Sequence, residues 1–120
     1  MSNIGEIHGS VTTAQFTAET AKYSLLKWAS GKLVVSIASD TLRFIVGSAE
    51  DKVLAADDYG AVRLRNAPGV RKCIAVGAIA LGVEVYSAAA GKVGATGTNK
   101  IGLSMSAAGA DLDEVLIQLD

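Results

Sequence analysis

The chain has few of the residues that carry enzyme chemistry. Among 120 residues it contains one histidine, His8, and one cysteine, Cys73. A Ser-His-Asp or Cys-His arrangement needs a histidine held rigidly beside the nucleophile, and His8 lies in an N-terminal stretch with little hydrophobic periodicity. A zinc site typically needs three or four His or Cys ligands, more than the chain has. We therefore expect no enzymatic activity, no catalytic residues and no bound metal.

The single cysteine also excludes an internal disulfide and favours a cytosolic origin. A lone Cys73 is typical of a small core hydrophobe. The most apolar stretch, residues 73–83, is shorter than the roughly 20 residues of a membrane span. The N-terminus lacks the basic start and apolar core of a signal peptide. We expect a protein that neither enters a membrane nor carries its own export signal.

Charge is also scarce. Charged residues make up 19% of the chain, against about 25% in typical proteins, and the net charge is −1. No run of Lys or Arg supplies a stripe that could follow a phosphate backbone, which argues against nucleic-acid binding. A surface with so little charge usually lies against another protein. The composition therefore favours self-association or a protein partner.

Two patterns that can signal a ligand site have simpler explanations. Carboxylates occur in clusters at 50–51, 57–58 and 111–114, and paired carboxylates can serve glycoside hydrolysis or bind Ca²⁺. A general acid needs an apolar pocket, and aromatic residues for substrate recognition make up only 5% of the chain. Gly91 and Lys92 are followed by Val93, where a phosphate-binding loop needs Ser or Thr. We interpret both patterns as turns and expect no cofactor.

Apolar residues alternate with a period of two over several short runs. We expect strands at residues 33–37, 42–46, 62–65, 83–86 and 115–119. Glycines separate these runs, as tight turns require. The predicted fold is mainly β: a small single-domain barrel or sandwich with short hairpins, at most one or two short helices, and an extended N-terminal arm. Residues 17–120 would form the domain and residues 1–16 the arm.

Two segments are compatible with a helix. Apolar residues between 17 and 28 have helical spacing after a possible N-cap at Thr17, whereas a strand over 22–28 would bring Leu25 and Leu26 into the core. We favour the strand. A second helix candidate covers residues 70–79, interrupted by Gly77.

The sequence also contains an internal repeat. Residues 45–48 followed by 61–64 resemble residues 100–103 followed by 114–117, which suggests two hairpins opposed in one barrel.

The first 16 residues are rich in Ser, Thr, Asn and Gly and lack a core of their own. Their apolar residues alternate roughly, which suits a strand added to the edge of a partner's sheet. A frayed terminus is the alternative. The candidate partner-binding residues are Ile4, Ile7, His8, Val11 and Phe16.

The order of the glycine-strand units resembles the capsid-cement, or head decoration, proteins of tailed bacteriophages. The resemblance covers residues 21–119 and rests on KYSLLK (22–27), GKLV (31–34), FIVG (44–47), GAVRL (60–64), GKV (91–93), IGLSMSAA (101–108) and LDEVLI (112–117). Residues 67–83 depart from the family pattern, which leaves the conformation of that segment open.

This resemblance implies a barrel-like structural virion protein that is made in the bacterial host cytoplasm and lies on the exterior of a capsid, where it stabilises the head. It implies the major capsid protein as partner, self-association as a trimer (a dimer being the other option), and an N-terminal arm that contacts the shell. Two alternatives stay open. One is a tail or shell component of a phage or bacterial assembly, and the other is a small ligand-binding or hydrolytic barrel that uses Asp57 and Asp58 beside Tyr59.

Overall fold

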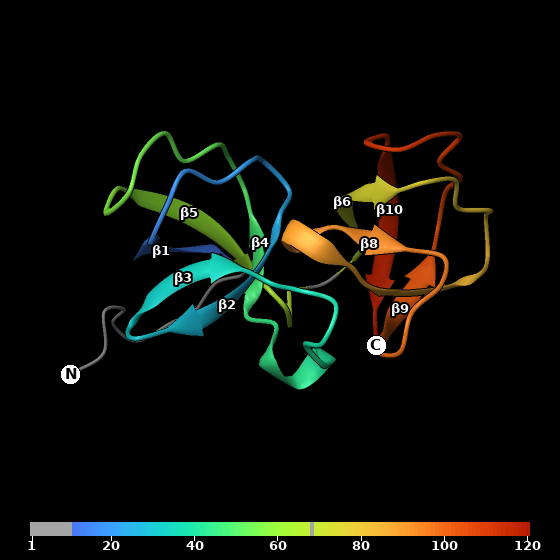
Figure 1. Cartoon of the computed structure of the whole chain (residues 1–120), viewed down its shortest axis with the longest axis horizontal. Coiled ribbons are helices and arrows are strands. Elements are labelled where there is room, and N and C mark those ends of the chain that lie inside the picture. The colour runs from blue at the N-terminus through green and yellow to red at the C-terminus, as the bar shows by residue number, and fades with distance from the viewer. Residues whose placement is uncertain (1–10, 68) are drawn as a thin grey trace.

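In the part of the chain that the structure describes, residues 11–67 and 69–120, the regular structure is ten short β-strands and two single turns of 3-10 helix (Figure 1). The structure is a computed structural model. The strands are β1 (Val11–Gln15), β2 (Leu25–Ala29), β3 (Lys32–Val35), β4 (Gly47–Ala49), β5 (Tyr59–Leu64), β6 (Arg71–Val76), β7 (Glu84–Ser87), β8 (Val93–Gly94), β9 (Lys100–Ser104) and β10 (Glu114–Leu119). The 3-10 turns are η1 (Leu42–Phe44) and η2 (Ala89–Gly91). The expectation of a mainly β fold is confirmed.

The period-two pattern located most strands correctly. The predicted strands at 33–37, 62–65, 83–86 and 115–119 correspond to β3, β5, β7 and β10. The preference for a strand before Trp28 is also confirmed, because β2 begins at Leu25 and both Leu25 and Leu26 are fully buried. In β3, β5, β7 and β10 the alternation reflects one side of a strand facing a core, whereas Leu25 and Leu26 of β2 are buried in different clusters.

The strand expected at 42–46 is wrong, because this segment contains the 3-10 turn η1. Backbone N–H groups of Phe44 and Ile45 donate to the carbonyls of Thr41 and Leu42, both at 3.0 Å. Leu42 and Ile45, three residues apart, pack into one hydrophobic cluster. Residues at this spacing lie on the same side of a 3-10 turn, so the apolar pattern has a period of three here.

The helix considered for residues 70–79 is also wrong. This segment contains β6, in which Cys73 and Ala75 are fully buried and alternate with the exposed Lys72 and Val76. β6 pairs with β10 on one edge and with β8 on the other. Because both edges take part in sheet hydrogen bonding, tertiary pairing outweighs the continuous apolar face seen in the sequence.

The strands form two five-stranded sheets that lie side by side along the long axis of the molecule (Figure 1). The first sheet has the order β1-β5-β4-β2-β3, and the second is a closed barrel with the order β10-β6-β8-β7-β9. The two orders are the same pattern, since β1 to β5 pair among themselves as β6 to β10 do. We call residues 11–65 the first repeat and residues 71–120 the second repeat.

The parallel contact that closes the barrel also occurs in both repeats. In the second repeat, Ala75 pairs with Val93 where β6 meets β8. In the first repeat, Phe16 and Leu33 make an isolated parallel bridge just beyond β1. The internal repeat seen in the sequence corresponds to β4–β5 and β9–β10. These strand pairs lie in separate sheets, however, and not opposed in one barrel as we expected.

The two repeats share a hydrophobic core and therefore form one domain. Leu25 and Ile45 of the first repeat belong to the same buried cluster as Val85 and Ile117 of the second. The connection between β3 and β4, residues 36–46, is longer than the equivalent connection 95–99 and lies against the second repeat. Three hydrogen bonds join them: Gly91 N to Ser36 O (2.7 Å), Asn99 Nδ2 to Ala38 O (3.0 Å) and Ser87 Oγ to Asp40 O (2.8 Å).

Candidate partner-binding surfaces

The five residues assigned to an N-terminal arm separate into two groups. Ile4, Ile7 and His8 lie outside the described residues. Val11 begins β1 and is 49% exposed, so it remains accessible to a partner. Phe16, by contrast, is fully buried in the core of the first repeat, and its assignment as a partner-binding residue is wrong.

The arm boundary expected at residue 16 is wrong for the same reason. β1 pairs antiparallel with β5 over its whole length, from Val11 opposite Arg63 to Gln15 opposite Tyr59. The alternation that suggested a strand for a partner's sheet belongs to the chain's own sheet, with Ala14 and Phe16 facing its core. Any arm is therefore confined to residues 1–10.

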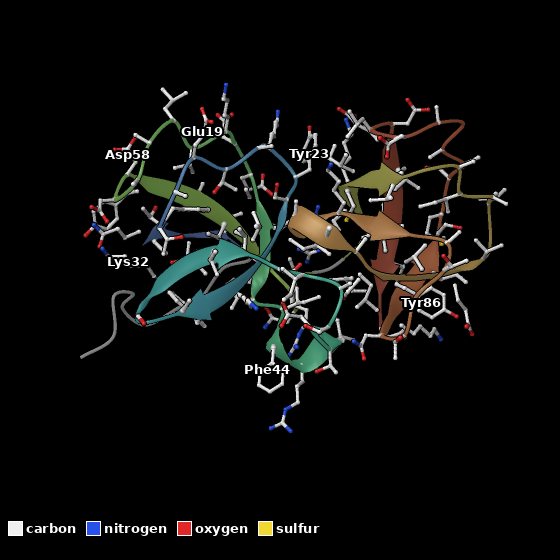
Figure 2. All side chains as sticks on the ribbon, viewed as in Figure 1. Glu19, Tyr23, Lys32, Phe44, Asp58 and Tyr86 are labelled. Carbon is white, nitrogen blue, oxygen red and sulfur yellow. The ribbon has the colours of Figure 1, made fainter. Side chains whose placement is uncertain are left out.

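Asp57 and Asp58, which the hydrolytic alternative requires, lie in an exposed turn before β5. Asp57 has a positive φ of 67°, and its Oδ1 is 2.6 Å from Lys32 Nζ. The backbone carbonyl of Asp58 accepts a hydrogen bond from Phe16 N at 2.9 Å. Figure 2 shows Asp58 and Lys32 at the outer end of the first repeat. Neither carboxylate lines the two concave regions described below, and both have the surroundings of turn residues.

Cys73 is fully buried in β6. Burial raises the pKa of its thiol to about 12, and the nearby Arg71 only partly opposes this shift. The thiolate is the nucleophilic form, so Cys73 is a poor nucleophile near neutral pH. Within residues 11–67 and 69–120, no group of three or more His, Cys, Asp or Glu side chains is arranged to hold a metal ion.

A concave surface of about 780 Å³ opens between β2, η1 and the end of β5. Its apolar side chains are Trp28, Phe44, Val46 and Leu64, and Arg43 and Arg65 add positive charge. We call it the Trp28 groove. Trp28 is 42% exposed and Phe44 58% exposed, and Figure 2 shows Phe44 projecting outward from η1. Aromatic and arginine side chains are enriched at protein interfaces.

The charges around the groove are partly paired. Lys27 Nζ and Asp40 Oδ2 lie 2.9 Å apart and both side chains are largely buried. The Arg43 guanidinium lies 5.4 Å from the centroid of the Phe44 ring, which is a cation–π contact. Because Asp40 already pairs with Lys27, Arg43 and Arg65 leave the groove with an excess of positive charge. The sequence analysis missed this site, since its residues come from three separate segments; the only signal was the presence of a tryptophan.

A smaller cleft of about 250 Å³ lies where the repeats meet, and Arg71 and Ser48 are buried polar residues of its lining. The Arg71 guanidinium donates hydrogen bonds to four oxygens: Ser48 Oγ and the backbone carbonyls of Arg63, Leu64 and Arg65. Burial lowers the pKa of this guanidinium. Its hydrogen bonds tie the start of β6 to β4 and the end of β5. Arg71 therefore serves to join the two repeats.

The second repeat exposes large apolar side chains of its own. They lie on β6, on β9 and in the connecting turns: Val76, Leu81, Leu103, Met105 and Leu112, each at least 38% exposed. Leu112 lies in a turn with a positive φ of 69°, as Asp57 does in the first repeat. The second repeat thus has an apolar side chain at the tip of the turn where the first has a charged one.

Among the described residues there is no helix of the length and apolarity needed to cross a membrane. No protein-family model matches this chain, and no curated protein matches it.

Proposed function

We propose that this chain is a non-enzymatic structural protein of a tailed-phage virion, which binds the outer surface of the capsid and stabilises the head. The observation that carries the proposal is the large apolar surface on a charge-poor chain. Eleven large hydrophobic side chains of the described residues are exposed, from Leu103 at 38% to Leu54 at 69%. Where such side chains gather into a patch, the surface usually lies at a protein–protein contact.

The sequence resemblance to capsid-cement proteins supports the type of partner, the major capsid protein. The closed barrel of the second repeat agrees with the barrel-like subunit that this resemblance implies. Self-association, as a trimer or a dimer, would multiply modest contacts. Several weak interfaces held together by symmetry give tight coating of a lattice through avidity.

The surroundings of the chemically reactive groups support a role without catalysis. The pKa of Cys73 is raised to about 12 by burial, and Asp57 forms an ion pair with Lys32 in an exposed turn. A tail or shell component would present the same surfaces, and only its partner would differ.

A binding experiment with bare capsids tests the proposal. Purified protein is mixed with heads assembled from the major capsid protein of the phage that encodes the chain, and pelleted protein is quantified beside a solution mass measurement. We expect the wild type to pellet with the heads. Leu81→Asp with Leu112→Asp should weaken pelleting, because the double variant places two charges on the apolar surface of the second repeat.

The matched control is Leu54→Asp with Tyr59→Asp, which makes the same change at exposed residues of the first repeat. A loss in only one of the double variants identifies the repeat that faces the capsid. Failure of the wild-type protein to pellet with the heads would overturn the proposed function.

A further inference from the structure

The hydrophobic core of the first repeat continues into the Trp28 groove. Leu26 and Val62 are fully buried in this core. Trp28 and Leu64 lie two residues further along the same strands, and side chains two apart in a strand point to the same face. Both line the groove, and Trp28 is 42% exposed. No described residue covers the core at this end.

The equivalent end of the second repeat is covered. Trp28 pairs with Leu33 between β2 and β3, and Ser87 pairs with Val93 at the same position between β7 and β8. Ser87 is 2% exposed, and its Oγ donates to Asp40 O of the connection 36–46. Leu42 of the same connection packs on the core of the second repeat. A segment from outside the barrel therefore covers this end in the second repeat, and no segment of residues 11–67 or 69–120 does so in the first.

Val11, the first described residue, lies beside the strand whose end borders the groove. Val11 lies opposite Arg63 in an antiparallel pair. Leu64, Arg65 and Asn66 follow Arg63 directly along the chain. These three residues of the β5 end line the groove.

We propose that the chain's own N-terminal segment, residues 1–10, docks in the Trp28 groove and covers the open end of the first repeat. Ile4 and Ile7 supply the apolar side chains, and Trp28, Phe44 and Leu64 supply the surface that they cover. The inference concerns the free protein and does not depend on capsid binding.

Length and charge fit this occupant. At about 3.3 Å per extended residue, Ile7 can lie up to roughly 13 Å from Val11 and Ile4 up to roughly 23 Å, within reach of a groove that begins beside Val11. Glu6 lies between the two isoleucines and suits the positive charge of Arg43 and Arg65. A tethered segment has an effective concentration of order millimolar, which favours the chain's own segment over that of a second copy.

Trp28 is the only tryptophan in the chain and lines the groove, so its fluorescence reports occupancy directly. The emission maximum and acrylamide quenching are compared for the full chain and for a variant without residues 2–9. We expect the deletion to shift emission to longer wavelength and to increase quenching. The full-length Ile4→Asp, Ile7→Asp double variant should do the same, because a carboxylate does not enter an apolar groove. Leu54→Asp, at an exposed site of the same repeat outside the groove, is the matched control and should change neither signal.

Three further measurements distinguish the occupants. A synthetic peptide of residues 1–10, added to the truncated protein, should restore the wild-type emission, and far-UV circular dichroism should show that both variants are folded. The wild-type emission should stay constant on dilution. Emission unchanged by the deletion would overturn the proposal. Emission that shifts on dilution would assign the groove to a second copy, and a blue shift seen only with bare capsids would assign it to the capsid protein; either result would also overturn it.

Discussion

Gly47 and Gly102 occupy the same position in the two repeats, each opposite a leucine of the next strand. A Cβ built on Gly47 would lie 2.0 Å from the carbonyl oxygen of Arg63, and one built on Gly102 would lie 2.2 Å from that of Gln118. Both contacts are with backbone, which has no room to move within a sheet. The two repeats therefore contain the same close approach of two strands, and only glycine permits it.

Gly47→Ala and Gly102→Ala should each destabilise the protein by about 2–4 kcal/mol, because the added methyl group must push two paired strands apart. Gly94→Ala is the matched control, since the nearest atom to its Cβ would be 3.5 Å away. Urea unfolding of the three variants measures the effect. Loss of stability at Gly94 as large as that at Gly47 would contradict the steric explanation.

Phe16→Ala should cost about 3–5 kcal/mol, the usual range for removing a fully buried aromatic side chain. Val11→Ala, at the exposed start of the same strand, should change the free energy of unfolding by less than about 0.5 kcal/mol. Thermal unfolding of both variants tests the assignment of β1 to the first repeat. A stability equal to that of the wild type in the Phe16 variant would mean that this segment is an arm after all.

Arg71→Ala should destabilise the protein by roughly 2–4 kcal/mol, because it removes the hydrogen bonds that the buried guanidinium donates to Ser48 Oγ and to three backbone carbonyls. Arg71→Lys should recover part of this loss, since a single ammonium group cannot reach all four oxygens. Lys72→Ala, next along β6 with a side chain that is half exposed, should have little effect. Denaturant titration gives the free energies of unfolding of the three variants and so their order. Equal stability of all three would show that Arg71 is not a structural link.

Cys73 should make the protein less stable in alkaline solution. The folded state holds the thiol proton up to a pKa of about 12, whereas an unfolded thiol loses it near 9.0. The contribution of the Cys73 thiol to the free energy of unfolding is therefore fully present below pH 9. It is lost as the pH rises from 9 toward 12, because the unfolded state then binds fewer protons than the folded state. Unfolding of the wild type and Cys73→Ala across this range should show a steeper decline for the wild type. At pH 8, a thiol reagent should modify Cys73 only after denaturant is added; rapid modification of the folded protein would contradict its burial.

The sequence by itself determined where one-sided strands lie and that the chain has one histidine and one cysteine. Leu33, Val62, Val85 and Val115 alternate with less buried neighbours, and that pattern is local, so β3, β5, β7 and β10 could be predicted. β4 could not, because Gly47, Ser48 and Ala49 are all buried and carry no alternation of apolar and polar side chains. The repeat was visible as a few shared apolar residues around Gly47 and Gly102.

Only the tertiary structure decided which strands share a sheet and which surfaces remain open. A strand pattern states that one face is buried but not against what, so Phe16 could belong to a partner's sheet or to its own. Pairing with β5 settled that question in favour of its own sheet. The Trp28 groove likewise depends on residues from β2, η1 and the end of β5, which are far apart in the sequence. Such surfaces arise from long-range packing, and local periodicity contains no information about it.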